Sequence, residues 1–251
     1  EYFKTADSPL RRALSGKPDS VAMAKKQHFA RNTWLHFSET AGAAQLEEVL
    51  QPGMSVPDSL QRLYAWIEDN GLYVDRPNGE RVGFLYPEED LRATWTDSDR
   101  QGGTIMEFLA EGNKYLHHWF GHNREEVLGR LCVFAKTGAE GSMAALWLAP
   151  DGIQRIVHLG SGSGSLMVCV LAEQPVDFIR LLAIGYDELC WGSAFAEPPN
   201  SESLADSIVV HPNSHLQAWV RRTFAVDIPK TGKEIVSHPD DMDATNSKDQ
   251  F

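Results

Sequence analysis

The chain has 251 residues, of which 42% are hydrophobic and 23% are charged, a composition typical of folded globular proteins rather than disordered or fibrous ones. No apolar run approaches the roughly 18 residues that a membrane-spanning helix needs. The 35 acidic and 23 basic side chains give a formal net charge of −12, which opposes direct binding to nucleic acid. We therefore expect no membrane segment and no nucleic-acid contact, and the acidity favours a basic partner.

The charge is unevenly distributed along the chain. Residues 1–36 carry seven basic and three acidic side chains, a net charge of +4, which leaves −16 on the other 215 residues. We expect residues 1–44 to form a basic arm followed by a helix, which begins near Asp19 and runs to about Leu50. Residues 45–230 are expected to form the folded domain, and residues 231–251 a polar, acidic tail.

The clearest helix signal runs from Leu60 to Ile67, where apolar residues recur at i, i+3, i+4 and i+7. Asp58 or Ser59 can cap the start of this helix, and the Asn-Gly pair at 70–71 supplies its stop. The pattern predicts an amphipathic helix with one buried face.

Two further elements follow. A short hairpin is expected over residues 76–86 around Asn78 and Gly79, with residues 83–86 as a strand. Apolar residues at helical spacing then predict a second amphipathic helix over residues 104–120.

The period of the apolar residues next changes to two, which is typical of strands. Connections of two to six residues separate these runs, and such short connections join antiparallel neighbours, because a parallel crossover needs a dozen or more residues. Two helices follow the runs, one from Pro175 to about Leu189 and one around residues 216–223. The pattern indicates an α+β fold with a mostly antiparallel meander flanked by helices, and the expected strands cover residues 131–135, 143–148, 153–159 and 166–171.

The alternating glycines of Gly160–Gly164 follow an apolar run, as in the first motif of adenosylmethionine-dependent methyltransferases. His158 stands where that motif has an acidic residue, however, and a strand-like run follows where a nucleotide site requires a helix. We therefore prefer a glycine-rich hairpin turn and expect no cofactor. The methyltransferase remains the less favoured alternative.

Histidines and cysteines offer weak metal signals. His118 and His122 have the i, i+4 spacing of zinc ligands, but Gly121 weakens the helix between them and no third ligand is evident. We expect structural or surface histidines and no metal site. Three cysteines without CxxC spacing indicate buried reduced thiols, which fits a reducing compartment and a cytoplasmic protein.

Carboxylates are plentiful, and runs of charge usually form solvated surfaces, so we expect no catalytic residues among them. Acidic side chains can instead bind a toxin whose active site recognises a polyanion, by placing carboxylates where the phosphates of that polyanion would lie. Complementary charge also speeds the association of the two proteins. On charge alone, the expected partner-binding residues are Glu88, Glu89, Asp90, Asp97, Asp99, Asp187 and Glu188.

The order of several motifs over residues 45–230 resembles that of the SUKH superfamily. In that superfamily, the set of motifs begins with a short segment that leads into a helix ending at Asn-Gly. Strands separated by glycines follow, and a helix comes last. These motifs are Val56-Pro-Asp-Ser-Leu60 with Asp69-Asn-Gly71, then Val133-Phe-Ala-Lys-Thr-Gly138, Ala145-Leu-Trp147, Ile156-Val-His-Leu-Gly160 and the helix that begins at Pro175.

The resemblance implies an α+β fold without catalysis. Many bacterial members are immunity proteins that neutralise toxins, often nucleases, and other members include a yeast cell-wall synthesis regulator. We therefore expect a cytoplasmic immunity protein that occludes a cognate, basic protein toxin by stoichiometric binding. A regulatory interaction scaffold of the same fold is the alternative.

Overall fold

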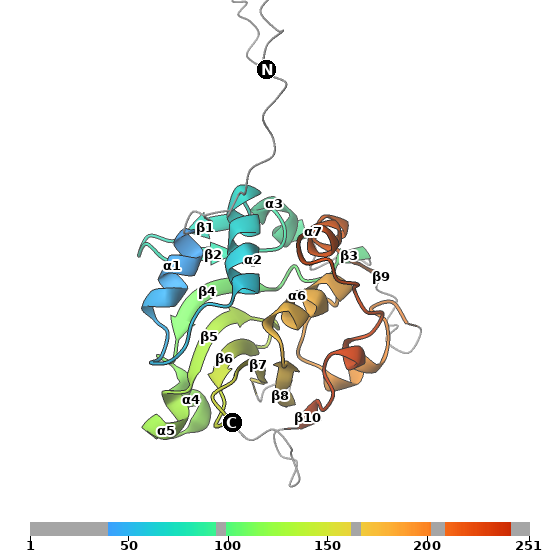
Figure 1. The fold of residues 1–251 in the computed structure, drawn as a ribbon. Helices are drawn as coiled ribbons and strands as arrows, with labels where there is room; N and C mark the ends of the chain where they lie inside the picture. Colours follow the sequence, from blue (N-terminus) through green and yellow to red (C-terminus); the bar gives the residue numbers. More distant parts are fainter. Residues whose placement is uncertain (1–39, 94–98, 162–166, 202–208, 242–251) are drawn as a thin grey trace, which may run out of the picture. The chain divides into compact units, whose positions relative to one another are not determined.

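The computed structural model describes residues 40–93, 99–161, 167–201 and 209–241 (Figure 1). Residues 19–39 of the helix expected from about Asp19 to Leu50 lie outside the described residues, as do the site residue Asp97 and the glycines at 162 and 164. The helices are α1 (Ala41–Glu48), α2 (Asp58–Asp69), α3 (Glu88–Ala93), α4 (Leu116–Phe120), α5 (Glu125–Leu128), α6 (Pro175–Ile184) and α7 (Ser214–Phe224), with 3-10 turns η1 (Gly192–Ala196) and η3 (Gly232–Glu234).

An eight-stranded sheet forms the centre of the fold, in the order β1-β2-β4-β5-β6-β7-β8-β10, and all of its neighbouring strands are antiparallel. A separate parallel pair joins β3 to β9. The predicted α+β class with an antiparallel meander is confirmed. The strands are β1 (Tyr73–Asp75), β2 (Arg81–Gly83), β3 (Asp99–Gln101), β4 (Glu107–Gly112), β5 (Leu131–Lys136), β6 (Met143–Leu148), β7 (Gln154–Leu159), β8 (Met167–Ala172), β9 (Val209–His211) and β10 (Asp240–Asp241).

Apolar side chains cover both faces of the sheet. Successive strand residues point to opposite faces, so Cys132 and Phe134 join the core under α1, α2, α6 and α7, which lie across one face (Figure 1). Leu131 and Val133 join a smaller core on the other face, together with Leu116 of α4 and Leu128 of α5. Burial on both sides explains why β5 is a nearly continuous apolar run.

The prediction of a helix over residues 104–120 is wrong. Residues 107–112 form β4, and only residues 116–120 are helical. Gly112 has a φ of 67°, a value that a right-handed helix does not contain. Phe108 stands opposite Ala135 of β5, so pairing with the sheet prevails over the helical spacing.

The described fold extends beyond residues 45–230 at both ends. Helix α1 begins at Ala41, and the backbone N–H of Gly42 donates to Glu68 Oε1 of α2 at 2.8 Å. At the other end, Val236 is fully buried and β10 pairs with β8. The predicted helix from Pro175 stops at Ile184 instead of Leu189, because Gly185 has a φ of 96°.

Gly102 and Gly185 meet at a close backbone crossing. A Cβ on Gly102 would overlap the carbonyl oxygen of Gly185, and a Cβ on Gly185 would lie 2.6 Å from Pro212 Cα. The N–H of Gly102 donates to His211 O at 2.9 Å, and the Tyr86 hydroxyl donates to Gly102 O at 3.0 Å. The crossing therefore fixes where the chain leaves α6.

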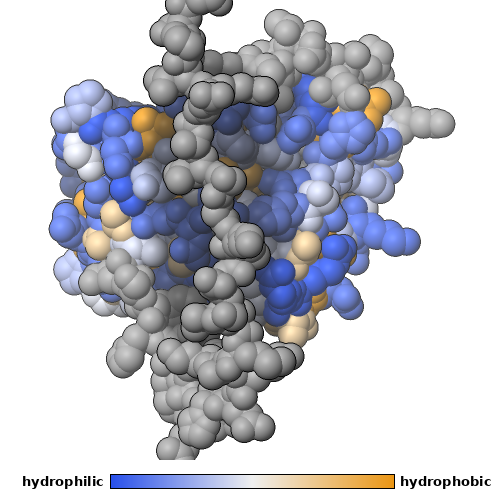
Figure 2. Space-filling model, turned by 90° about the horizontal axis from the view of Figure 1, so that it is seen from above, coloured by the Kyte–Doolittle hydropathy of each residue, from blue (hydrophilic) through white to orange (hydrophobic). Residues whose placement is uncertain are grey.

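The surface seen from above in Figure 2 is mostly hydrophilic, and its hydrophobic residues stand in small, separate groups. Among the described residues, the large hydrophobic side chains that are exposed include Tyr115 and Trp191. None of the helices in this part of the chain combines the length and apolarity that a membrane span requires.

Candidate functional site

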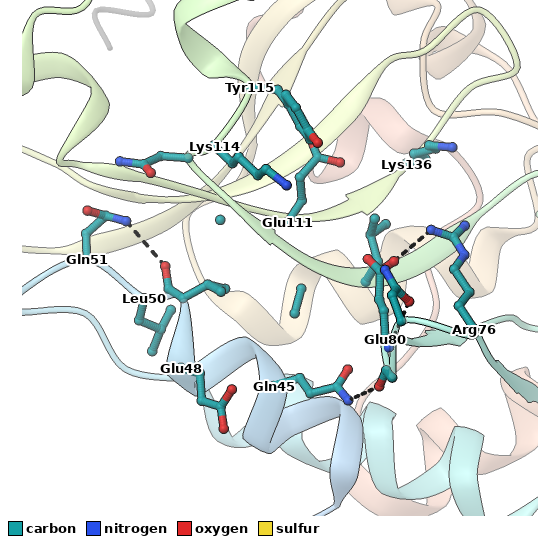
Figure 3. A pocket seen from close by; sticks show the side chains of 17 residues that line it. Gln45, Glu48, Leu50, Gln51, Arg76, Glu80, Glu111, Lys114, Tyr115 and Lys136 are labelled. Atoms are coloured by element: carbon teal, nitrogen blue, oxygen red, sulfur yellow. Dashed lines mark hydrogen bonds and ion pairs between the residues drawn. The ribbon is translucent and has the colours of Figure 1, made fainter.

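A cleft of about 860 Å³ opens between α1, the β1–β2 hairpin and β4 (Figure 3). Gln45 and Glu48 project from α1 on one side, while Glu111, Lys114 and Tyr115 come from β4 and the loop that follows it. The side chains of Arg76 and Glu80, at the hairpin, and of Lys136, at the end of β5, complete the charged lining. Concave sites with convergent polar groups are the usual places for binding.

Gln45 fixes one wall of the cleft by joining α1 to the hairpin. Its Nε2 donates to Gly79 O at 2.8 Å, and its Oε1 accepts from the backbone N–H of Arg81 at 2.9 Å. Gly79 has a φ of 85°, a conformation that glycine adopts without steric cost in such turns. One side chain thus holds both flanks of the turn against the helix.

The basic side chains of the cleft already have partners. Arg76 forms ion pairs with Glu80 at 2.9 Å and with Glu107 at 3.4 Å, and Lys136 pairs with Glu107 at 3.4 Å. The Lys114 ammonium lies 4.9 Å from the centre of the Tyr115 ring, and a hydrogen bond with Tyr115 raises the pKa of Lys114. The cations of the cleft are therefore engaged within the protein.

Two carboxylates of the cleft remain available to a ligand. Across the described ranges, Glu48 and Glu111 form no hydrogen bond or ion pair through their side chains. Glu48 is exposed on α1, whereas burial raises the pKa of the half-buried Glu111, an effect that the charge of Lys136 opposes. A cation entering the cleft would favour the ionised form of Glu111 and pair with it. The cleft is thus suited to a basic side chain.

The residues expected from charge lie elsewhere. Glu88, Glu89 and Asp90 occupy the first turn of α3, where Glu88 and Glu89 are exposed. Asp187 forms an ion pair with Arg100 at 2.9 Å. Burial raises the pKa of Tyr86, and the charges of Asp187 and Asp90 add to this shift, so the fold brings these two acids near one ring.

The other expected residues do not join that group. Glu188 faces a different cluster, described below, and Asp99 begins β3, although its side chain lies outside the described structure. None of the described candidates lines the cleft. Glu48 and Glu111 were not among the predicted site residues, because neither lies in a distinctive local sequence motif.

Glu140, Glu188 and Cys190 form a compact cluster on the β5–β6 connection and the loop after α6. Their potential ligand atoms all lie within 4.8 Å of one another. Cys190 Sγ donates to Glu188 Oε2 at 3.0 Å, the backbone N–H of Ala139 donates to the same oxygen at 3.3 Å, and the Ser142 hydroxyl donates to Glu140. These are the described residues that could hold a metal ion.

The two carboxyl groups of this cluster are hydrogen-bonded to each other. Burial raises the pKa of Glu188 and of the Cys190 thiol. Burial acts in the same direction on Glu140, but hydrogen bonds, first that from Ser142, hold the pKa of Glu140 below its usual value. Of the two carboxyl groups, Glu188 therefore holds its proton to higher pH, and it can donate that proton in a hydrogen bond to Glu140.

His158 is fully buried on β7, where it stands opposite Ala144 and Cys169. Neither ring nitrogen has a hydrogen-bond partner in the described part of the chain. Burial lowers the pKa of His158 to about 3, and the charge of Glu140 offsets this only in part. The imidazole is therefore neutral at physiological pH.

The described residues also bear on the glycine-rich motif and on the histidine motif. Strand β8 follows β7 and pairs with it in antiparallel fashion, so the Gly160–Gly164 run connects two neighbouring strands and no helix follows it. Helix α4 ends at Phe120, and Gly121 has a φ of 68°, so His122 lies beyond the helix that carries His118. The zinc-like i, i+4 spacing therefore does not place these two imidazoles on one helical face.

Comparisons of the chain with protein-family models, with curated proteins and with solved structures found no match. The SUKH resemblance therefore stays a prediction. The cleft and the Glu140–Glu188–Cys190 cluster are the structural features that bear on function.

Acid is expected to destabilise the fold through His158. Its pKa is lower in the folded than in the unfolded chain, so below about pH 6.5 the unfolded state binds more protons. The free energy of unfolding should therefore fall with decreasing pH, by at most about 1.4 kcal/mol per pH unit from this group. Urea unfolding between pH 7 and pH 4, with a metal chelator present, measures this effect.

The variant His158→Leu isolates the contribution of this histidine, because the carboxylates that also titrate are unchanged. We expect its unfolding free energy to depend less steeply on pH than that of the wild type. The variant His118→Leu, at an exposed position, should keep the wild-type slope. Equal slopes for His158→Leu and the wild type would contradict the assignment.

Proposed function

We propose that the chain is a cytoplasmic immunity protein that binds and neutralises a cognate bacterial toxin by stoichiometric occlusion. The observation that carries the proposal is the cleft, in which the basic groups are paired and Glu48 and Glu111 remain available. The net charge of −16 outside residues 1–36 and the SUKH resemblance support it.

A basic side chain of the toxin enters the cleft in this mechanism. Its guanidinium or ammonium group pairs with Glu111 and Glu48. These carboxylates take the place of the negatively charged groups of the toxin's own substrate. Tyr115 is 51% exposed at the rim and offers an aromatic contact of the kind that often dominates binding energy. Charge and aromatic surface thus occur together at one place.

A nuclease is the toxin class that best suits this arrangement. Nucleases bind a polyanion through basic residues, so an acidic inhibitor can cover the same groups. The net charge of −16 outside residues 1–36 would also attract a basic toxin before contact. Salt screens this long-range attraction. Binding should therefore slow as the salt concentration rises.

Co-expression tests the proposal directly. Each protein encoded beside this gene is produced in a sensitive bacterial host, with and without the chain. We expect the chain to protect against one of these proteins and to form a complex with it. Absence of protection against every toxic neighbour would contradict the proposed function.

A further inference from the structure

We propose that Glu140, Glu188 and Cys190 bind a divalent transition-metal ion, for which zinc is the best match, with His158 as the fourth donor. The site lies outside the cleft and shares none of its lining residues. The inference is therefore independent of the proposed toxin binding.

The backbone brings the three ligands together from two segments that are distant in sequence. Glu140 lies in the connection between β5 and β6, whereas Glu188 and Cys190 follow α6. The segments are joined at the backbone, because the N–H of Leu189 donates to Thr137 O at 2.9 Å. The ligand atoms of Glu140, Glu188 and Cys190 lie within 4.8 Å of one another, so these three groups need only a small contraction to surround one ion. The His158 ring is not part of that group and must move toward it to act as the fourth donor.

Unpaired buried polar atoms beside the cluster provide a second, independent observation. Thr137 Oγ1 and both ring nitrogens of His158 are buried without a hydrogen-bond partner in the described residues. Such groups are rare, because each one loses its hydrogen bonds to water on burial. The charge of Glu140 acts on the His158 ring. A metal ion at the cluster would give this imidazole a partner.

The donor set selects the class of metal. A thiolate, an imidazole and carboxylates are the ligands of zinc, which accepts four of them in tetrahedral geometry. Zinc binds the thiolate form of Cys190, so the thiol must lose its proton to solvent and metal uptake releases protons. Glu140 and Glu188 are partly exposed, which leaves the ion a route of entry.

The bound ion would tie the loop after α6 to the β5–β6 connection. Four protein donors leave no open position for a substrate, so its role is structural. Because the ion binds the folded state, it should raise the melting temperature of the protein.

Metal titration of the purified full chain tests the inference. We expect one Zn²⁺ per chain by equilibrium dialysis and a higher melting temperature when Zn²⁺ is added. With Co²⁺ in place of Zn²⁺, we expect the near-ultraviolet charge-transfer absorption of a cobalt–thiolate bond. The absence of that absorption from the wild type would overturn the assignment without any variant.

Matched thiol variants locate the site. Cys190→Ala should lose the cobalt–thiolate absorption and weaken Zn²⁺ binding at least about tenfold. Cys132→Ala, which removes a buried thiol near Val49, should keep both properties. Glu188→Gln and His158→Phe should also weaken binding about tenfold or more. Unchanged Zn²⁺ affinity in folded Cys190→Ala or Glu188→Gln would overturn the proposal.

Discussion

Gly185→Ala is expected to destabilise the domain by about 3 kcal/mol or more. The new side chain would require a positive φ of 96°, and its Cβ would lie 2.6 Å from Pro212 Cα. Backbone atoms cannot rotate away as a side chain can, so the backbone at Gly185 and at Pro212 must move apart. Urea unfolding of the wild type and the variant at pH 7 measures the difference.

Gly71→Ala is the matched control. Gly71 has a φ of 68°, but nothing lies within 4 Å of the position that a Cβ on this residue would take. The substitution therefore carries only the cost of the left-handed conformation, about 1–2 kcal/mol. Equal destabilisation by the two variants would show that the overlap at Pro212 contributes nothing.

Reversing the charge of both available carboxylates in the cleft is expected to abolish most toxin binding. In Glu48→Lys with Glu111→Lys, the basic side chain of the toxin meets two cations instead of two anions. We expect the dissociation constant to rise at least about 30-fold, which corresponds to about 2 kcal/mol. Calorimetric titration with the toxin identified by co-expression measures the change.

A second double variant has the same net charge but changes another surface. Glu88→Lys with Glu89→Lys alters the exposed first turn of α3. Its main expected effect is slower association, with a change in affinity of about threefold or less, because exposed charges act at long range. If this variant loses binding and the cleft variant keeps it, the toxin binds at α3.

The sheet and the main helices were predictable because their signals are local. Alternating apolar residues with short connections leave only antiparallel neighbours, as found for β5 to β8. The apolar spacing from Leu60 to Ile67 likewise predicted α2. The periodicity of residues 104–120 was misleading, because the same spacing fits a strand, a glycine turn and a short helix in succession.

The candidate sites could not be predicted in the same way. Glu48 and Glu111 line the same cleft only because α1 packs beside β4, and Gln45 sets the position of the hairpin opposite. Glu188 was identified from its charge, but its place beside Glu140 depends on the backbone bond between Leu189 and Thr137, which joins two segments distant in sequence. Local charge does not reveal which acids the fold pairs and which it leaves available.

Calorimetric titration of the chain into its toxin, with toxin activity followed in parallel, is the decisive experiment on the proposed inhibition. We predict one chain per toxin, complete loss of toxin activity at equivalence, and weaker binding at higher salt and in the Glu48→Lys, Glu111→Lys variant. Full toxin activity in the presence of excess chain, or equally tight binding by that variant, would contradict the proposal.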